Sequence, residues 1–383
     1  MYKKAFSVFS AILIMLSSCV ISNAYEDLAL SAKSAVLIVA DTGEIVYAKN
    51  ENEKLPMAST TKIMTSLLAI EYGNPAKEIT VTDEMLKVEG TSIGLLPGDS
   101  VNLNTLISGM LLESGNDAAN VTAFAVSGGV EPFLELMNNR AKEIGMNNTS
   151  FDTPSGLDSK NHYSTAYDMA LLGACAVNNP QFLNICSQKQ ETVYYGNPPY
   201  RRTLTNHNKL LSMYDGCIGI KTGFTKKSGR CLVSAARRDN ITLVAVTLNA
   251  GDDWNDHEKM FDYGFSKVKN QSLPNDISYA RLNVVGGEKA DIGVRLSFTP
   301  YLPSVNENKD ISLKVLLSKF EYAPLSEGRV VGTAYYYSGG RLIAEVPVVT
   351  GEDVGLFPAT VIKESFFDKI KNFFRKNFGE KYD

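Results

Sequence analysis

Strand-like apolar runs flank a long stretch of helical periodicity, and this order constrains the fold more than any other feature of the chain. Residues 34–49 have the pattern of two β-strands joined by a turn at Asp41-Thr42-Gly43. Further strands are predicted at 217–222, 230–236 and 241–249, and helices at 59–72, 103–113, 116–127, 131–144, 166–177 and 254–268. Strands on both sides of a helical middle indicate an α+β domain, or an α/β sandwich around one antiparallel sheet.

The pattern changes near Leu273-Pro274-Asn275. From there to Thr360 the chain consists mostly of short β-runs separated by Gly, Pro, Asn and Ser turns. These runs lie at 280–285, 291–297, 311–317, 329–337 and 341–348. We therefore predict a larger domain over 25–272 and a small C-terminal all-β domain over 273–360.

Residues 361–383 differ again, because aromatic and basic side chains recur there at nearly helical spacing. The apolar members are Phe366, Phe367, Ile370, Phe373, Phe374 and Phe378, and the basic members are Lys363, Lys369, Lys371, Arg375 and Lys376. An amphipathic helix with basic flanks is typical of a segment that lies on a membrane surface. Docking of the same helix on the β domain is the alternative.

The first 24 residues have the layout of a secretory signal peptide. Lys3 and Lys4 form a positive start, an apolar run covers residues 5–16, and Ser22-Asn23-Ala24 provides a small-residue cleavage site. Cleavage after Ala24 predicts an exported protein. A lipoprotein cleavage box over 16–19, which would leave Cys19 lipidated, is the alternative.

Composition excludes several classes of protein. Hydrophobic residues make up 44% and charged residues 21% of the chain, as in ordinary globular proteins, which excludes disordered and coiled-coil classes. The net charge of −4 gives no support to a nucleic-acid partner, which would favour a basic face. The three histidines are too scattered for a histidine-rich metal site. The cysteines that remain after cleavage form no Cys-Xaa-Xaa-Cys pair and are predicted to be buried free thiols: Cys175, Cys186, Cys217 and Cys231.

The first of three short motifs is Ser59-Thr60-Thr61-Lys62, at the start of the predicted helix 59–72. Ser59 would cap this helix, and its spacing from Lys62 puts both side chains on one helical face. A serine hydroxyl becomes nucleophilic when a base takes its proton, and a lysine can be that base if burial or another cation lowers its pKa. A second Ser-Xaa-Xaa-Lys at 266–269 lies near a helix end and is explained by capping alone.

The second motif, Ser114-Gly115-Asn116, lies between two predicted helices. Ser114 could relay a proton between Lys62 and a leaving nitrogen, and Asn116 could hydrogen-bond a substrate amide. A simple helix–helix turn with a capping residue would have the same pattern.

The third motif is Lys221-Thr222-Gly223, at the end of a strand-like run. A cation and a hydroxyl at a strand edge can hold a substrate carboxylate, and Gly223 lets a ligand backbone approach closely. The peptide N–H of Phe224 could pair with that of Ser59 as an oxyanion hole.

In this order the three motifs resemble the motif set of penicillin-binding proteins and serine β-lactamases. Their surroundings resemble the low-molecular-weight D-alanyl-D-alanine carboxypeptidases, a family of serine peptidases. The similar segments are 56–65, 111–119, 153–165 and 219–225. The resemblance extends over nearly the whole chain and implies a β-lactamase/transpeptidase-like α/β (α+β) sandwich, followed by the small β domain and the amphipathic tail.

The resemblance also implies a role for each matching position. Ser59 would be acylated by the carbonyl of the penultimate D-alanine, with Lys62 as general base and Ser114 as proton relay. The substrate-binding positions would be Asn116, Lys221, Thr222, Gly223 and, through its backbone, Phe224. Water would then hydrolyse the acyl-enzyme, and penicillins would acylate Ser59 as substrate mimics. The resemblance implies no metal or cofactor.

The implied partners are peptidoglycan stem peptides that end in D-Ala-D-Ala, at the outer face of the cytoplasmic membrane. Lys54 is one departure from the resemblance, since many relatives have Arg there, and it alters a charge near the nucleophile segment. Two residues, His207 and Lys209, are candidates for the cation that would assist Lys221.

Three other classes of protein share features with this sequence. Gly90-Thr91-Ser92-Ile93-Gly94 matches the nucleophile elbow of α/β-hydrolases, but a predicted helical stretch at 83–88 stands where that elbow needs a strand. A serine β-lactamase would use an acid such as Glu131, which instead begins a predicted helix, and it would lack the β domain and tail. A non-catalytic sensor of D-Ala-D-Ala or β-lactams on the same fold is the third alternative, but nothing in Ser59, Lys62, Ser114 or Lys221 indicates a degenerate site.

Overall fold

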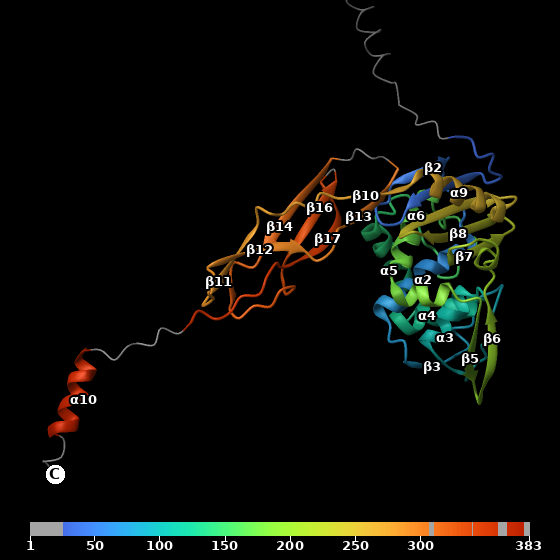
Figure 1. The fold of residues 1–383 in the computed structure, drawn as a ribbon. Coiled ribbons are helices and arrows are strands. Elements are labelled where there is room, and N and C mark those ends of the chain that lie inside the picture. Colours follow the sequence, from blue (N-terminus) through green and yellow to red (C-terminus); the bar gives the residue numbers. More distant parts are fainter. Residues whose placement is uncertain (1–25, 306–309, 339, 359–365, 379–383) are drawn as a thin grey trace, which may run out of the picture. The chain divides into compact units, whose positions relative to one another are not determined.

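The computed structural model describes residues 26–305, 310–338, 340–358 and 366–378. Within these ranges the chain forms two compact units (Figure 1). The first contains the residues up to Asn270 and a returning segment at 303–305, and the second contains the rest. The predicted signal peptide over 1–24 lies outside the described residues.

A five-stranded antiparallel sheet forms the centre of the first unit, in the order β2-β1-β9-β8-β7. Its strands are β1 (Ser34–Val39), β2 (Ile45–Lys49), β7 (Cys217–Thr225), β8 (Gly229–Arg238) and β9 (Ile241–Ala250). The N-terminal hairpin joins the late strands through the pairing of β1 with β9, which confirms the predicted antiparallel sheet that the two sets of strands form. β7 is an edge strand, so one row of its backbone groups is not paired within this sheet.

Both faces of the sheet are covered, because successive apolar residues of its strands enter two different cores. On β1, Val36 and Ile38 belong to one hydrophobic core, and Leu37 and Val39 belong to the other. The strand is therefore buried on both sides, which explains why its sequence is an unbroken apolar run.

Helix α6 (Ala166–Val177) packs on one face of this sheet, and helix α9 (Asp253–Lys267) packs on the other. Glycines permit the close approach: a Cβ on Gly173 of α6 would lie 2.9 Å from Val244, and one on Gly264 of α9 would lie 2.5 Å from Leu37. The three layers confirm the predicted α/β sandwich.

Four further helices of the first unit lie near predicted positions: α2 (Lys62–Tyr72), α3 (Leu103–Leu111), α4 (Asn116–Ser127) and α5 (Val130–Ile144). Two short helices were not predicted, α7 (Pro180–Cys186) and α8 (Leu210–Met213). One prediction at a helix start was wrong: Ser59 does not cap α2, because residues Ala58–Thr61 form a separate 3₁₀ turn before it.

A second, smaller sheet was missed in the sequence. It contains β3 (Glu78–Thr80), β4 (Ser100–Asn102), β5 (Gln190–Gly196) and β6 (Pro199–Thr205), in the order β3-β4-β5-β6. The hairpin of β5 and β6 is mostly solvent-exposed, so its buried residues are too few for a clear alternation. The predicted helical stretch at 83–88 is instead a series of turns.

The second unit is mostly β-structure, as predicted. A six-stranded sheet has the order β14-β16-β17-β12-β11-β15. Its strands are β11 (Arg281–Val285), β12 (Asp291–Leu296), β14 (Ile311–Leu317), β15 (Glu321–Tyr322), β16 (Val330–Ser338) and β17 (Arg341–Thr350). A separate pair consists of β10 (Lys269–Ser272) and β13 (Tyr301–Ser304).

Helix α10 (Phe366–Phe378) lies within the predicted amphipathic segment. Three of its apolar side chains, Phe367, Ile370 and Phe373, are exposed to solvent. In the described part of the chain, no helix combines the length and the apolar character that a membrane crossing requires.

Candidate active site

Ser59 lies in the 3₁₀ turn Ala58–Thr61, three residues before Lys62, the first residue of α2. Ala58 has a φ of +48°, and the hydroxyl of Thr60 donates to the carbonyl of Met57 at 2.6 Å. These features hold Ser59 half-exposed at the surface of a cavity rather than inside a helix.

The Lys62 ammonium group is fully buried and has three oxygen partners. Its Nζ lies 2.9 Å from Ser59 Oγ, 2.7 Å from Asn116 Oδ1 and 2.6 Å from the carbonyl of Ser155. Burial, and secondarily the charge of Lys221, holds the pKa of Lys62 well below its usual range. A neutral lysine next to a serine hydroxyl is the arrangement that a general base requires.

Ser114 stands between α3 and α4 in the left-handed region, with a φ of +63°, and is nearly buried. The next residue but one, Asn116, is fixed at both ends of its side chain: Oδ1 accepts from Lys62, and Nδ2 donates to the carbonyl of Glu89 at 2.7 Å. The structure therefore brings the second motif against the first, with Asn116 as the direct link.

Lys221 is buried on the edge strand β7. Its Nζ donates to the carbonyl of Thr222 at 3.0 Å, and burial lowers the pKa of Lys221 to about 7. Gly223 explains how close β7 comes to the 3₁₀ turn: a Cβ there would lie 3.1 Å from Met57 O and from Ser59 N. The third motif thus lies directly beside the nucleophile segment.

A cavity of about 490 Å³ opens where the three motifs meet. Its lining residues are Ser59, Thr91, Ser114, His207, Thr222, Gly223, Phe224, Arg230, Asp253 and Trp254. Lys62, Asn116 and Lys221 are buried behind this lining. The side chain of Phe224 is 65% exposed, so only its backbone and one side of its ring can contribute to the inner wall.

The two cations considered as assistants of Lys221 differ in position. His207 lines the cavity, and its Nε2 lies 3.6 Å from Glu113 Oε2. Burial and the charge of Lys221 lower the pKa of His207, and Glu113 opposes this. Among the described residues, Lys209 does not line the cavity and instead borders a separate one.

Sequence reasoning missed two residues that support Lys62 and the turn that holds Ser59. The Ser155 carbonyl accepts from Lys62, and His162 supports the turn that holds Ser59. His162 Nδ1 accepts from the N–H of Asp152 at 3.0 Å, so its Nε2 carries the proton and donates to Thr61 Oγ1 at 2.8 Å. Burial lowers the pKa of His162 to about 4, which keeps this ring neutral at pH 7.

The segment 153–165 had been singled out in the sequence, but nothing in its spacing assigns these roles. Ser155 acts through a backbone carbonyl, which every residue has, and His162 acts through Thr61 rather than on the cavity. Only the fold brings them beside residues about 100 positions earlier.

Two further candidates have structural roles. Ser92 Oγ donates to Asp117 Oδ2 at 2.6 Å in a loop without a preceding strand, so the hydrolase-elbow geometry is absent from this described loop. Ser266 Oγ donates to the carbonyl of Tyr263 at 2.7 Å within the last turn of α9, so its contact is local but it does not cap a helix.

The matching family models cover both units of the chain. Residues 21–252 match the model described as D-alanyl-D-alanine carboxypeptidase, of the peptidase S11 type. Residues 269–355 match the C-terminal domain of penicillin-binding protein 5.

Similar sequences and similar solved structures indicate the same family as the family models. The chain is 34% identical to D-alanyl-D-alanine carboxypeptidase DacF of Bacillus subtilis over 343 residues, which cover 86% of this chain and 87% of the relative. It is 31% identical to DacC of Escherichia coli, covering 92% of this chain and 89% of that one. The crystal structure of penicillin-binding protein 5 from Haemophilus influenzae superposes with a TM-score of 0.61 at 27% identity, over 87% of this chain and 99% of the other. With the first family model matching more than half of its residues, this chain belongs to the D-alanyl-D-alanine carboxypeptidase family of serine peptidases.

Proposed function

We propose that Ser59 is the nucleophile of a D-Ala-D-Ala carboxypeptidase that removes the terminal D-alanine from peptidoglycan pentapeptide stems. The observation that carries this proposal is the contact of Ser59 Oγ with Lys62 Nζ at 2.9 Å, where Lys62 is buried and its pKa is strongly lowered. Membership of the family supplies the reaction class, and the cavity supplies a place for a peptide end.

In the first step, Ser59 Oγ attacks the carbonyl carbon of the penultimate D-alanine while its proton passes to Lys62 Nζ. The peptide N–H groups of Ser59 and Phe224 stabilise the negative charge that develops on the carbonyl oxygen. The close approach of β7 to the 3₁₀ turn at Gly223 supports this pairing of backbone donors.

The tetrahedral intermediate then collapses and the C–N bond to the terminal D-alanine breaks. The proton held by Lys62 returns to the leaving nitrogen through Ser114. A water molecule attacks the acyl ester, Lys62 takes a proton from it, and Ser59 leaves with a proton regained. The products are free D-alanine and a stem peptide one residue shorter, so atoms and protons balance.

Three further positions hold the substrate in this proposal. Lys221 and Thr222 bind the terminal carboxylate, and of these two Thr222 lines the cavity. Asn116, whose Oδ1 accepts from Lys62, binds the amide of the acyl part. A β-lactam presents a strained amide and a carboxylate at similar spacing, so it acylates the same serine.

The enzyme works outside the cell at the outer face of the cytoplasmic membrane. The N-terminal segment directs export, and residues 361–383 hold the protein on the membrane surface. The exposed aromatic side chains of Phe367 and Phe373 on helix α10, next to basic residues, support this placement.

The test is release of free D-alanine from a soluble peptide that ends in D-Ala-D-Ala. We expect release by the wild type and none by Ser59→Ala, with Ser92→Ala as a matched control that retains activity. No release by the wild type, despite covalent labelling by penicillin, would instead identify a sensor.

A further inference from the structure

We propose that a second cavity, beside α8, binds the carboxylate end of a neighbouring peptidoglycan stem and thereby holds the polymer at the active site. This inference rests on the proposed function, because it adds a second contact with the polymer on which that reaction takes place. The cavity has a volume of about 570 Å³. Its lining comes from the base of the β5–β6 hairpin, the loop that follows β6, and α8.

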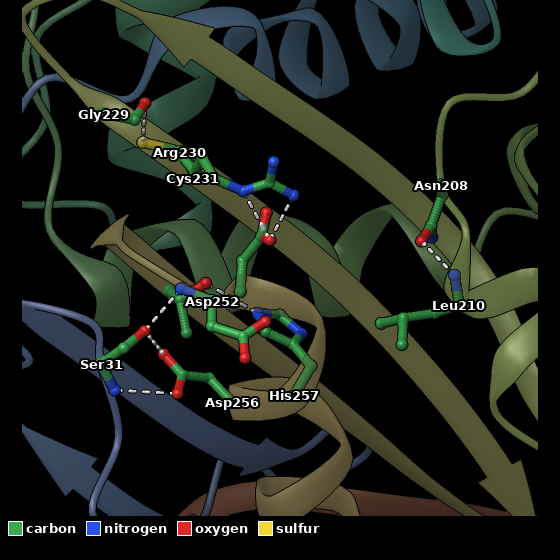
Figure 2. Close-up of polar contacts among 11 residues, drawn as sticks. Ser31, Asn208, Leu210, Gly229, Arg230, Cys231, Asp252, Asp256 and His257 are labelled. Carbon is green, nitrogen blue, oxygen red and sulfur yellow. Dashed lines mark hydrogen bonds and ion pairs between the residues drawn. The ribbon is translucent and has the colours of Figure 1, made fainter.

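A buried amide donor without a partner belongs to this cavity. Asn208 lines it, although the residue is only 3% exposed. Its Oδ1 accepts from the N–H of Leu210 at 3.2 Å, as Figure 2 shows. Because that N–H can only donate, the remaining polar atom of the side chain is the amide nitrogen. Within the described residues this Nδ2 has no hydrogen-bond partner, and a bound ligand with an acceptor oxygen would satisfy it.

The loop that carries Asn208 is fixed by its own hydrogen bonds. The N–H of Asn208 donates to Asn206 Oδ1 at 2.9 Å, and Asn206 Nδ2 donates to the carbonyls of Cys186 and Gln188 at 3.0 and 2.9 Å. The N–H of Asn206 donates to the carbonyl of Lys189 at 2.9 Å. These bonds join the loop to the segment between α7 and β5, so the unpartnered amide has a defined position.

The charge of the lining favours an anion. Lys189 and Lys209 both line the cavity and are exposed to solvent. Among the described residues, no Asp or Glu belongs to this lining. Two cations and an amide donor suit a carboxylate, whose two oxygens accept several hydrogen bonds. Leu211 and the exposed Met213 add an apolar side, which fits a small methyl group.

The second cavity adjoins the active site through the loop after β6. His207 lines the cavity at Ser59, whereas its two neighbours, Asn206 and Asn208, line the cavity beside α8. Consecutive residues of one short loop therefore belong to the two cavities. A ligand beside α8 lies next to the active site but outside the three motifs.

A stem peptide has the chemistry that this cavity matches. A stem that ends in D-alanine presents a free carboxylate beside a methyl group. Because one peptidoglycan strand carries many stems, a stem held beside α8 raises the effective concentration of its neighbour at Ser59. A short soluble peptide has a single end and gains nothing from the second cavity.

The direct test measures binding while the active site is blocked. The full mature protein, with isotope-labelled asparagine, is acylated with benzylpenicillin and then titrated with acetyl-L-Ala-D-Ala. We expect a saturable shift of the NMR signal of the Asn208 side-chain amide. The same peptide with a C-terminal amide should cause no shift, because it lacks the carboxylate.

Two variants test the residues that carry the inference. Lys189→Gln combined with Lys209→Gln should weaken binding at least about tenfold, through the loss of charged hydrogen bonds. Asn208→Asp keeps the acceptor for Leu210 and replaces the donor by an anion, so it should abolish binding. Lys77→Gln is the matched control, since it removes an exposed cation of the same unit from outside the cavity lining. If Asn208→Asp does not fold, the double lysine variant alone decides.

Kinetics separate this inference from the proposed function. In the double lysine variant, release of D-alanine from uncross-linked peptidoglycan should fall roughly tenfold, while release from a soluble tripeptide should be unchanged. Equal losses on both substrates, no shift of the Asn208 signal, or a shift with inorganic phosphate but not with the peptide would overturn the inference. Absence of release from both substrates by the wild type would overturn the proposed function, whereas the binding experiment would still decide the second cavity.

Discussion

At the scale of single residues, the proposed mechanism assigns opposite charge states to two buried lysines. In that mechanism Lys62 is neutral, so that it can accept a proton from Ser59, and Lys221 is protonated, so that it can attract a carboxylate. Burial lowers the pKa of both, and the charge of Lys221 lowers that of Lys62 further. The positive charge that Lys221 needs for its own role therefore also favours the neutral form of Lys62.

The opposite charge states proposed for Lys62 and Lys221 predict a bell-shaped pH profile for kcat/KM with a soluble peptide. Activity falls at acid pH as Lys62 is protonated, and it declines above about pH 7 as Lys221 loses its charge. In Lys221→Arg the cation persists, so the alkaline decline should disappear even if the maximum is lower. Lys226→Arg should leave the profile unchanged. An alkaline limb that persists in Lys221→Arg would contradict the role given to Lys221.

The residues that could be predicted from the sequence are those whose chemistry depends on side-chain type at fixed spacing. Ser59 and Lys62 are separated by one helical turn, and Lys221, Thr222 and Gly223 are contiguous. Ser155 and His162 could not be found in this way, because one acts through its backbone and the other through Thr61. Arg230, which also lines the cavity, was not identified in the sequence, because only strand pairing brings it beside Thr222.

At the scale of elements, the catalytic geometry depends on the contact between strand β7 and the 3₁₀ turn Ala58–Thr61. Gly223 is the point of closest approach, since a Cβ there would lie 3.1 Å from Met57 O, Ser59 N and Thr60 N. The turn, the strand and Lys62 at the start of α2 must keep their spacing within a few tenths of an ångström for backbone donors to face one oxyanion.

We therefore predict that Gly223→Ala slows acylation by penicillin by roughly 10²- to 10³-fold, the effect of losing one oxyanion donor. The added methyl pushes the strand from the turn, while the rest of the sheet keeps its pairing. Stopped-flow acylation rates measure this. The matched control is Gly293→Ala on β12, where a Cβ would meet only Arg281, at 4.0 Å. An unchanged rate in Gly223→Ala would show that the spacing is not critical.

Prediction of elements succeeded where burial imposes a strong period and failed where it does not. The buried strands β1 and β9 and the helices α4 and α6 were placed almost to the residue. The exposed hairpin β5–β6 was missed, and the start of α2 was placed three residues early. A 3₁₀ turn and a first helical turn have similar sequence patterns, and tertiary contacts with β7 decide between them.

At the scale of the whole molecule, the chain combines a catalytic unit, a β unit and an amphipathic segment. The division by contacts falls at Asn270, and the chain returns to the first unit at 303–305. Ser304 there donates to Glu44 Oε2 at 2.8 Å. A sequence pattern cannot show such a return, because the contacts with Glu44 join residues that lie about 260 positions apart in the chain.

We predict that the amphipathic segment over 361–383 attaches the protein to the membrane surface. Deletion of residues 361–383 should release the mature protein from the membrane fraction, because the exposed aromatic and basic residues of α10 are lost. Hydrolysis of a soluble peptide should be unchanged. Membrane retention after the deletion that is abolished by adding Cys19→Ser would identify a lipid at Cys19 as the anchor. Retention in both variants would contradict each of these anchors.

The central claim is that Lys62 activates Ser59 for acyl transfer, and covalent labelling tests it most directly. The mature protein is incubated with benzylpenicillin, and the adduct is located by peptide mass spectrometry. We predict one long-lived adduct, on Ser59, whose rate of formation falls sharply in Lys62→Ala and is unaffected in Ser92→Ala. An adduct on Ser92 or Ser114, or rapid penicillin turnover without an adduct, would contradict it.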